Sequence, residues 1–340
     1  MTTAPVPPAP AITAAGLTKS YGDKTVLDGI DLRIAEGTVF ALLGPNGAGK
    51  TTTVQILSTL RTADAGRARV AGHDVHDAAD AVRAAIGVTG QFSAVDHLLT
   101  ARENLLLMAD LHHLDRREGR RRAAELLRRF ELTEAAGKPV ATFSGGMRRK
   151  LDLAMTLVGK PRIIFLDEPT TGLDPRSRRT MWDIIRGLVA DEGVTLFLTT
   201  QYLEEADQLA DRIAVLDGGK IVAEGTAEEL KRRVPGGHIR LRFADAHGLE
   251  AAAALFDPGP SVSPSASYGS VGRDAEALTL DVPSDGSIPA LRSVLDALDD
   301  AAIEAEQLTV HTPDLDDVFL TLTGPAAYDR NANFPKEQAR

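Results

Sequence analysis

One stretch decides the fold of this chain: Gly44-Pro45-Asn46-Gly47-Ala48-Gly49-Lys50-Thr51. It follows the apolar run 38–43, which predicts a buried strand, and it leads into a helix expected to begin near Lys50. Glycines let backbone N–H groups converge on an anion, and the N-terminus of the next helix carries partial positive charge. Lys50 adds a full positive charge. A chance glycine turn explains this context less well than a phosphate-binding loop, which we therefore predict.

A second apolar run ends in two carboxylates. Residues 163–166 read Ile-Ile-Phe-Leu and are followed by Asp167 and Glu168. Taken alone, such a strand end is usually one that reaches solvent. Together with the glycine loop it marks the edge of a sheet where α/β proteins bind ligands. Asp167 is suited to the coordination shell of Mg²⁺, and Glu168 to taking a proton from an attacking water or orienting it.

A third short motif, Ser144-Gly145-Gly146, precedes a helix expected to run from about Met147 to Val158. Its serine and glycines would expose amide groups at the start of that helix, which makes a second phosphate cradle in the same chain. A lone Ser-Gly-Gly is more often a flexible turn. Its position shortly before the acidic strand favours the functional interpretation.

Composition bounds the class of protein. Of the 340 residues, 43% are hydrophobic, so a large buried core and two domains are expected. The formal net charge of -10 argues against a nucleic-acid binder, because such proteins usually present a strongly basic face. The absence of cysteine excludes disulfides and thiolate chemistry and favours a cytosolic location. No apolar run is long enough to span a bilayer.

Periodicity divides the chain into segments. Residues 1–11 are rich in Pro and Ala, lack the regions of a signal peptide, and are expected to be a disordered leader. Residues 12–233 alternate strand and helix patterns, with a helical subdomain over about 92–160, which predicts an α/β domain. A small α+β domain is expected over 236–323, followed by a flexible tail, 324–340.

Within the α+β domain the sequence predicts both element types. Strands are expected at 238–243, 277–282 and 303–312, and helices at 288–298 and 315–322. Between the first two strands lies a loop rich in Ser, Pro and Gly, 258–272.

Five motifs now stand in order along the chain: the glycine loop, Gln91, Ser144-Gly145-Gly146, Asp167-Glu168-Pro169-Thr170 and Gly172-Leu173-Asp174. This set resembles the ordered motifs of ABC ATPases, and chance rarely produces such an order. The resemblance covers about residues 11–233. It implies a P-loop NTPase cassette with a mixed sheet, ATP and Mg²⁺ as ligands, and ATP hydrolysis as the activity. It also implies a head-to-tail homodimer, in which the Ser144 loop of one subunit closes on the γ-phosphate held by Lys50 of the other.

The resemblance assigns roles to individual residues. It implies nucleotide contacts at Tyr21, Gly44, Pro45, Asn46, Gly47, Ala48, Gly49, Lys50, Thr51, Thr52, Gln91, Ser144, Gly145, Gly146 and Asp174. Mg²⁺ would be held by Thr51, Gln91 and Asp167, and Gln91 would also relay to a membrane partner. Tyr21 would stack on adenine, the alternative being an ordinary aromatic at a strand end. Asp174 would line the dimer interface.

The chain departs from the family at Gln201, where most members carry a histidine after the strand that ends in Thr199-Thr200. Glutamine can donate a hydrogen bond to the γ-phosphate, but it cannot take up and release a proton near neutral pH. We therefore expect Gln201 to act as a positioning switch. Glu168 would carry the proton chemistry, and Lys50 would complete the catalytic set.

Two further segments resemble one branch of the family. Residues 199–207 read Thr-Thr-Gln-Tyr-Leu-Glu-Glu-Ala-Asp, and 311–320 read His-Thr-Pro-Asp-Leu-Asp-Asp-Val-Phe-Leu. Both are similar to the daunorubicin-resistance branch of drug-exporter ATPases. In that branch the ATPase is a peripheral subunit at the cytoplasmic face of the cell membrane, and a separately encoded multispan permease expels antibiotics or lipids. The α+β domain would stabilise the dimer, communicate with the permease, or serve as a structural appendage.

Other ABC classes fit the sequence less well. A translation-factor ABC protein carries two cassettes, whereas one phosphate loop occurs here. A chromosome-maintenance ATPase inserts a long coiled coil, which residues 52–143 are too few to hold. An importer ATPase stays open, because importers and exporters share the catalytic motifs and the permease sets cargo and direction.

The helical subdomain holds two more candidate features. Arginines at 116–122 and 128–129 predict a solvated helix face, with anionic lipid headgroups as the alternative contact. Adjacent His112 and His113 point about 100° apart on a helix, which makes them a poor metal pair. The segment 92–104 is the better candidate for docking a permease.

Overall fold

A computed structural model describes residues 10–90, 94–233, 237–256, 271–284, 286–311 and 313–323. The chain divides into two compact units, of which the second is Glu229–Thr321. Gln91, most of the Ser/Pro/Gly-rich loop, most of the expected leader and all of the expected tail lie outside the described residues.

The first unit is built on a six-stranded sheet with the order β10-β9-β3-β8-β7-β6. Five strands are parallel: β3 (Val39–Leu43), β6 (Ile86–Thr89), β7 (Ile163–Asp167), β8 (Thr195–Thr200) and β9 (Arg212–Asp217). The sixth, β10 (Lys220–Gly225), is antiparallel to β9. The turn between them contains Gly218 and Gly219, both with positive φ, which a tight hairpin of this kind requires. The sheet is therefore mixed, as the resemblance implied.

A second sheet of the first unit has four strands in the order β2-β1-β4-β5. Its strands are β1 (Pro10–Tyr21), β2 (Lys24–Ala35), β4 (Ala65–Val70) and β5 (His73–Asp74). A turn at Gly22-Asp23 joins β1 to β2, and Tyr21 pairs with Lys24 across it. β1 begins at Pro10, within the expected leader. The pairing of β4 with β1 was not predicted, because the sequence of β4, Ala-Gly-Arg-Ala-Arg-Val, has a weak strand pattern.

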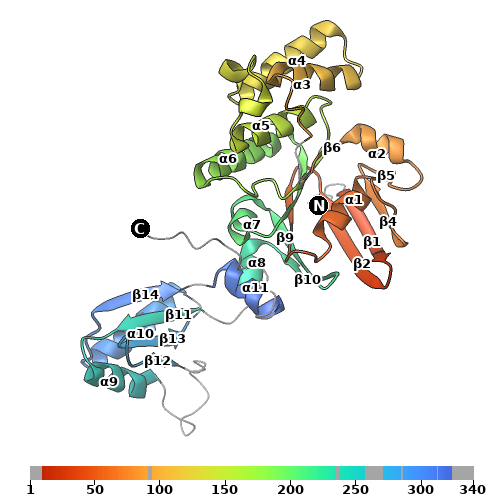
Figure 1. Ribbon diagram of the computed structural model, residues 1–340. Helices are drawn as coiled ribbons and strands as arrows, with labels where there is room; N and C mark the ends of the chain where they lie inside the picture. Colours follow the sequence, from red (N-terminus) through yellow and green to blue (C-terminus); the bar gives the residue numbers. More distant parts are fainter. Residues whose placement is uncertain are drawn as a thin grey trace, which may run out of the picture. The chain divides into compact units, whose positions relative to one another are not determined.

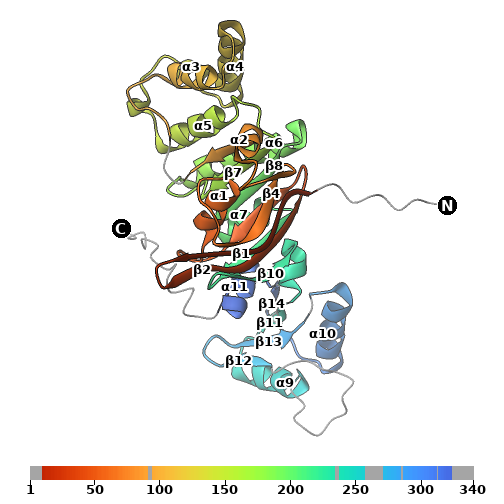
Figure 2. The ribbon, with the colours of Figure 1, turned by 90° about the vertical axis from the view of Figure 1, so that its right-hand side faces the viewer.

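Helices flank these sheets. They are α1 (Lys50–Leu57), α2 (Ala79–Ala85), α3 (Ala101–Leu111), α4 (Arg116–Arg129), α5 (Gly145–Thr156), α6 (Pro175–Glu192), α7 (Leu203–Leu209) and α8 (Ala227–Lys231), with 3₁₀ turns at Thr133–Ala135 and Val140–Thr142. Figures 1 and 2 both show α3 and α4 together at one end of the first unit. Within the predicted helical subdomain, α3 and α4 are separate helices, because Asp115 caps a new helix by accepting bonds from the N–H groups of Arg117 and Glu118.

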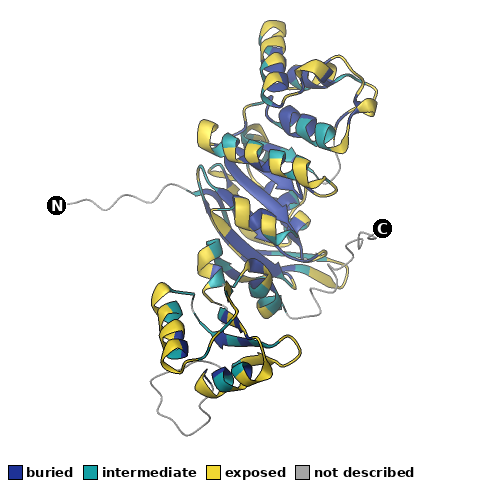
Figure 3. Cartoon of the chain, turned by 90° about the vertical axis from the view of Figure 1, so that its left-hand side faces the viewer, coloured by how far each residue is buried: buried dark blue, intermediate teal, exposed yellow. Residues whose placement is uncertain are grey.

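The core of the first unit lies on the strands. All residues of β3, β7 and β8 are buried, which is typical of parallel strands covered on both faces. Figure 3 shows these strands in the colour of buried residues, with exposed residues on the outer helices. The rings of Phe40 and Phe165 lie 5.5 Å and 5.6 Å from that of Phe197, so aromatic contacts join the three strands at their middles.

The second unit is an α+β fold with an antiparallel sheet in the order β12-β13-β11-β14. Its elements are β11 (His238–Arg242), α9 (Ala246–Phe256), β12 (Gly272–Asp274), β13 (Thr279–Pro283), α10 (Ile288–Asp300), β14 (Gln307–His311) and α11 (Leu315–Thr323). The sequence predicted all of these except α9 and β12. Ile239, Leu241 and Phe243 help to form its own core with residues of α9 and α10.

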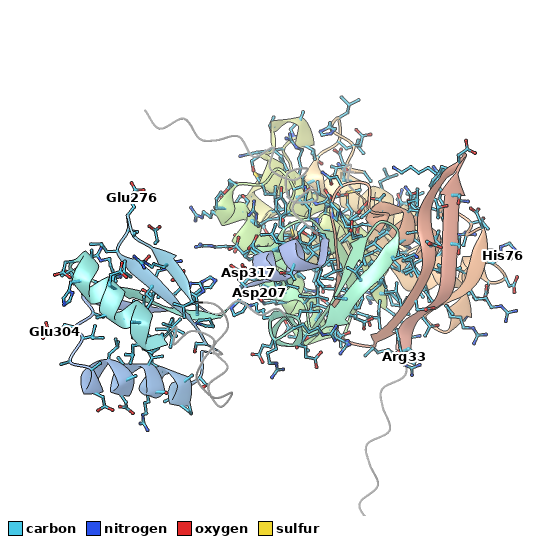
Figure 4. All side chains as sticks on the ribbon, turned by 90° about the horizontal axis from the view of Figure 1, so that it is seen from below. Arg33, His76, Asp207, Glu276, Glu304 and Asp317 are labelled. Atoms are coloured by element: carbon cyan, nitrogen blue, oxygen red, sulfur yellow. The ribbon has the colours of Figure 1, made fainter. Side chains whose placement is uncertain are left out.

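Many charged side chains lie at the surface of each unit. Figure 4 shows this for Arg33 and His76 in the first unit and for Glu276 and Glu304 in the second. No helix among the residues that the structure describes is both long and apolar enough to cross a bilayer.

Candidate nucleotide-binding site

The glycine loop connects β3 to α1, and α1 begins at Lys50 as predicted. Gly44 lies against β9, the neighbour of β3 in the sheet, since a Cβ added at Gly44 would come within 2.3 Å of the carbonyl oxygen of Leu216. Gly49 has a φ of +113° and faces Leu27, whose Cδ2 would lie 2.6 Å from an added Cβ. Both positions require glycine. At Gly44 there is no room for a Cβ, and at Gly49 the backbone conformation also disfavours any other residue.

Lys50 is buried at the start of α1. Its ammonium group donates hydrogen bonds to the carbonyl oxygens of Gly44 at 2.7 Å and Pro45 at 3.1 Å. It also lies 3.5 Å from Oε1 of Glu168. Burial lowers the pKa of Lys50, and the carboxylates of Glu168 and Asp167 oppose that shift. The predicted phosphate-binding lysine and the predicted catalytic carboxylate therefore meet in one buried place.

Asp167 ends β7 and is buried. Its Oδ1 accepts hydrogen bonds from Thr51 Oγ1 at 3.3 Å and from Thr199 Oγ1 at 2.5 Å. The structure therefore brings together two of the three predicted Mg²⁺ ligands, and the third, Gln91, lies outside the described residues. A hydroxyl and a carboxylate at this separation fit Mg²⁺, which prefers a few hard oxygen ligands and completes its shell with water and phosphate.

Glu168 has a left-handed backbone with φ 51°, which is uncommon for a residue other than glycine. Its N–H donates to the carbonyl oxygen of Thr199 at 3.1 Å, and its Oε2 accepts from Thr171 Oγ1 at 3.3 Å. Backbone conformations of this kind cost free energy and persist where surrounding contacts enforce them, often in functional sites. The turn at Glu168 aims its side chain toward Lys50.

Gln201 directly follows β8, which lies between β3 and β7. Leu43 pairs with Thr200 and Asp167 with Thr199 in the parallel register, so the C-terminal ends of the three strands meet at one edge. The N–H of Gly44 also donates to the Thr200 carbonyl at 3.3 Å. Half-buried Gln201 therefore lies at the same sheet edge as the glycine loop and Glu168.

Ser144 and Asp174 are exposed and cap two adjacent helices. Ser144 Oγ accepts from the N–H of Met147 at 3.2 Å, and α5 begins at Gly145, slightly earlier than predicted. Asp174 accepts from the N–H groups of Arg176 and Ser177 at the start of α6, and these bonds, together with that from the Ser177 hydroxyl, lower its pKa. Among the described residues neither side chain hydrogen-bonds to Lys50 or Glu168.

Tyr21 is the last residue of β1 and is 41% exposed. Lys19 Nζ lies 5.7 Å from the centre of its ring, and the guanidinium carbon of Arg61 lies 5.6 Å away. A half-exposed ring with cations beside it is able to stack a flat heterocycle.

Sequence reasoning missed two residues around the strand end, the largely buried Arg149 and the fully buried Glu205. Arg149 reaches the backbone of Glu168. Glu205 accepts hydrogen bonds from Thr170 Oγ1 at 2.8 Å and Trp182 Nε1 at 3.1 Å. Burial raises the pKa of Glu205, against the effect of hydrogen bonds from Thr200, Thr170 and Trp182. Both residues lie in charged stretches that read as solvated helix faces, so residue type alone carried no signal.

Comparison with known proteins places this geometry in a family. A family model described as ABC transporter matches residues 27–171. Daunorubicin resistance ATP-binding protein DrrA3 of Streptomyces coeruleorubidus is 52% identical over 315 residues, covering 92% of this chain and 96% of that protein. Daunorubicin/doxorubicin resistance ATP-binding protein DrrA of Streptomyces peucetius is 45% identical over 333 residues, covering 98% of both.

A solved structure agrees with the fold of the first unit. The dimeric ATP-binding cassette MJ0796, in a post-hydrolysis state bound to ADP and Pi, is 28% identical with a TM-score of 0.58, covering 63% of this chain and 98% of that one. The predicted fold class and family are confirmed. Because relatives match along almost their whole length, the chain belongs to the ABC transporter family and is one of its ATP-binding, ATP-hydrolysing subunits.

Proposed function

We propose that this chain powers an exporter: two copies bind Mg-ATP head to tail and drive a separate membrane permease that expels antibiotics, or lipids. The observation that carries the proposal is the match to daunorubicin- and doxorubicin-resistance ATP-binding proteins along nearly the full length of each chain. The ATPase would associate with the permease at the cytoplasmic face of the cell membrane as a peripheral subunit.

The residues of the sheet edge would share the work of hydrolysis. The glycine loop and Lys50 would hold the phosphates, because the buried ammonium group already lies among loop carbonyls. Glu168 would orient the attacking water or take its proton, and Gln201 would donate a hydrogen bond to the γ-phosphate. Thr51 and Asp167 would hold Mg²⁺, which neutralises charge on the phosphates when bound.

The exposed caps would complete the site from the other subunit. Ser144, Gly145 and Gly146 present a helix N-terminus to solvent, and such a terminus attracts anions. Asp174 caps the neighbouring helix. A second copy would bring this loop to the γ-phosphate held at Lys50, with Tyr21 against adenine, and the dimeric state of the related cassette supports this arrangement.

A capture experiment tests the transporter assignment. Tagged Glu168→Gln protein with Mg-ATP is pulled down from native detergent-solubilised membranes, because slowed hydrolysis should hold the closed dimer and its partners together. The matched control is Lys50→Ala, which lacks the phosphate-binding charge. A multispan membrane protein recovered with Glu168→Gln and depleted with Lys50→Ala supports the proposal, and ribosomes or nucleoid proteins in its place contradict it.

Deleting the gene of the captured membrane protein then separates export from import. An exporter predicts higher intracellular accumulation of an anthracycline or another cargo in the deletion strain. Lower accumulation of a nutrient with unchanged drug sensitivity would assign the ATPase to an importer.

A further inference from the structure

Arg149 lies in the second turn of α5 and is largely buried, with 11% of its side chain exposed. All three of its guanidinium nitrogens donate hydrogen bonds. Nε donates to the carbonyl oxygen of Pro169 at 2.8 Å, Nη1 to that of Gly90 at 2.8 Å and to Asp152 Oδ2 at 3.3 Å, and Nη2 to the carbonyl oxygens of Asp167 at 3.2 Å and Glu168 at 3.3 Å.

The three consecutive carbonyl groups of residues 167–169 converge on Arg149 because the chain turns sharply at Glu168, where φ is 51°. Buried carbonyl groups without donors cost free energy, so a turn of this kind needs a donor on its inner side. One planar guanidinium group supplies donors for all three. Arg149 therefore fixes the backbone from which the Glu168 side chain extends.

Asp152, one turn further along α5, extends the same support. Its Oδ2 accepts from Arg149, and its Oδ1 accepts from the N–H of Ala94 at 3.2 Å. Together the two side chains bind the carbonyl of Gly90 at the end of β6 and the amide of Ala94. One face of α5 thus holds two separate chain segments by their main-chain groups.

α5 begins at the Ser144-Gly145-Gly146 loop. We propose that Arg149 is a positioning residue for ATP hydrolysis, which ties the backbone carrying Glu168 to the helix that starts at this loop. This inference rests on the proposed roles of Glu168 and of the Ser144 loop. A displacement of α5 when the loop meets the partner's nucleotide is passed to Glu168 through a rigid, fully bonded side chain. The contact of the Ser144 loop with the partner's nucleotide, which closes the dimer, thereby also positions the carboxylate of Glu168.

Lysine cannot replace arginine in this role. An ammonium group has three donors on a single atom and cannot span carbonyl groups that a planar fork reaches with separate nitrogens. The Arg149→Lys variant keeps the positive charge beside Asp152 while losing the fork. The neighbouring Arg148 is a matched control, because the one hydrogen bond that its side chain makes among the described residues goes from Nη1 to the Phe143 carbonyl at 3.0 Å.

The experiment compares full-length wild type, Arg148→Lys, Arg149→Lys, Arg149→Gln and Glu168→Gln. We measure kcat and KM for Mg-ATP, the Kd for Mg-AMP-PNP, and the midpoint of thermal unfolding. Arg149→Lys and Arg149→Gln should lower kcat by about 10- to 100-fold, the size of effect that misplacement of a reacting group produces. Their Kd for Mg-AMP-PNP should remain close to that of wild type, as should every value for Arg148→Lys.

A double variant sharpens the assignment. In the Glu168→Gln background, Arg149→Lys should cause no further loss of turnover, because both changes act through one carboxylate. A kcat near that of wild type in Arg149→Lys overturns the proposal. Loss of Mg-AMP-PNP affinity together with kcat in both Arg149 variants, or a thermal midpoint below the assay temperature in both, also overturns it and assigns Arg149 to maintenance of the fold. A lower midpoint that stays above the assay temperature is expected, because the carbonyl groups lose their donors. If wild type is inactive, or Glu168→Gln retains turnover, the proposed function itself fails, and the positioning role fails with it.

Discussion

The ammonium group of Lys50 lies 3.5 Å from a carboxylate oxygen of Glu168, and both side chains are buried. Lys50, which we propose holds phosphate, is therefore already paired with Glu168, which we propose orients the attacking water. A bound phosphate would supply Lys50 with a second negative partner, so nucleotide binding and this ion pair are energetically linked.

Glu168→Gln should lower the free energy of unfolding in the absence of nucleotide by about 1.5–3 kcal/mol, the range for a hydrogen bond to a charged group. The change leaves the buried ammonium group with carbonyl groups as its hydrogen-bond partners and Asp167 as the remaining nearby carboxylate. Mg-AMP-PNP should then stabilise the variant more than wild type, because its phosphates replace the missing charge. Thermal unfolding with and without Mg-AMP-PNP measures this. Thr171→Ala is the control, since it removes the 3.3 Å bond to the same carboxylate and no charge; equal ligand-induced shifts in wild type and Glu168→Gln would contradict the link.

Gln201→His should give the pH profile of kcat a limb near the histidine pKa of about 6.5, which wild type lacks because an amide does not titrate there. Gln201→Ala should lower kcat by about 10- to 100-fold at all pH values, as expected for loss of one hydrogen bond to a charged group. Steady-state turnover measured from about pH 5.5 to 8.5 tests both. An unchanged profile in Gln201→His, with full activity in Gln201→Ala, would remove Gln201 from the catalytic set.

Glu205→Gln should make stability less dependent on pH. Burial raises the pKa of Glu205 above its ordinary value of 4.5, so the folded state binds this proton more tightly than the unfolded state. The contribution to stability is then fully present below pH 4.5 and declines as pH rises toward the folded-state pKa. The neutral amide avoids this loss and can still accept from Thr170 and Trp182.

Chemical denaturation of Glu205→Gln and wild type over a series of pH values measures this difference. The variant should be the more stable protein at neutral pH, and its advantage should shrink on acidification. An advantage for wild type that grows with pH would show that Glu205 is held ionised, with the nearby Arg178 as its partner.

Gly145→Ala separates the role of the Ser-Gly-Gly loop in the fold from its role in the dimer. An added Cβ at Gly145 would lie 4.0 Å from Leu173 Cδ2, its nearest neighbour, so the isolated subunit has room for it. Stability should therefore hold, while ATP turnover should fall, because the methyl group would occupy the place proposed for the partner's phosphate. Gly146→Ala is the contrasting variant, since its Cβ would approach Ser177 Oγ to 2.7 Å and disturb the start of α6. Full turnover in Gly145→Ala would count against closure of this loop on nucleotide.

The sequence predicted the parts of the site that are local in the chain. The glycine loop, the acid pair at Asp167 and the helix start at Lys50 each follow from a strand or helix signal within a few residues. The hydrogen bonds of Arg149 were beyond prediction, because they join α5 to Gly90, which follows β6, and to Asp167 of β7, and only the folded sheet brings these residues close. Glu205 was equally hidden, since its burial depends on packing between α6 and α7. The pairing of β4 with β1 in the antiparallel four-stranded sheet escaped prediction for the same reason, because the two strands are separated in sequence by β2, β3 and α1.

The predicted roles differ in how far geometry supports them. Thr51, Asp167, Lys50 and Glu168 lie within one group of contacts. Tyr21 stays a prediction, because an exposed ring at a strand end is suitable for stacking with or without adenine. Domain limits also stay predictions, although the compact unit Glu229–Thr321 lies within the range in which the α+β domain was expected to fall, apart from its first residues.

Both carboxylate oxygens of Asp174 already accept hydrogen bonds within the same chain. Its Oδ1 accepts from the N–H groups of Arg176 and Ser177 at 3.1 Å and 3.0 Å, and its Oδ2 accepts from the Ser177 hydroxyl at 2.6 Å. A donor from a second subunit would compete with these bonds, and replacing one hydrogen bond by another yields little net affinity. Asp174 would then favour the correct orientation of the two subunits while adding little to the affinity between them. The proposed interface would then separate easily once the nucleotide has been cleaved, as an ATPase dimer that reopens in every cycle requires.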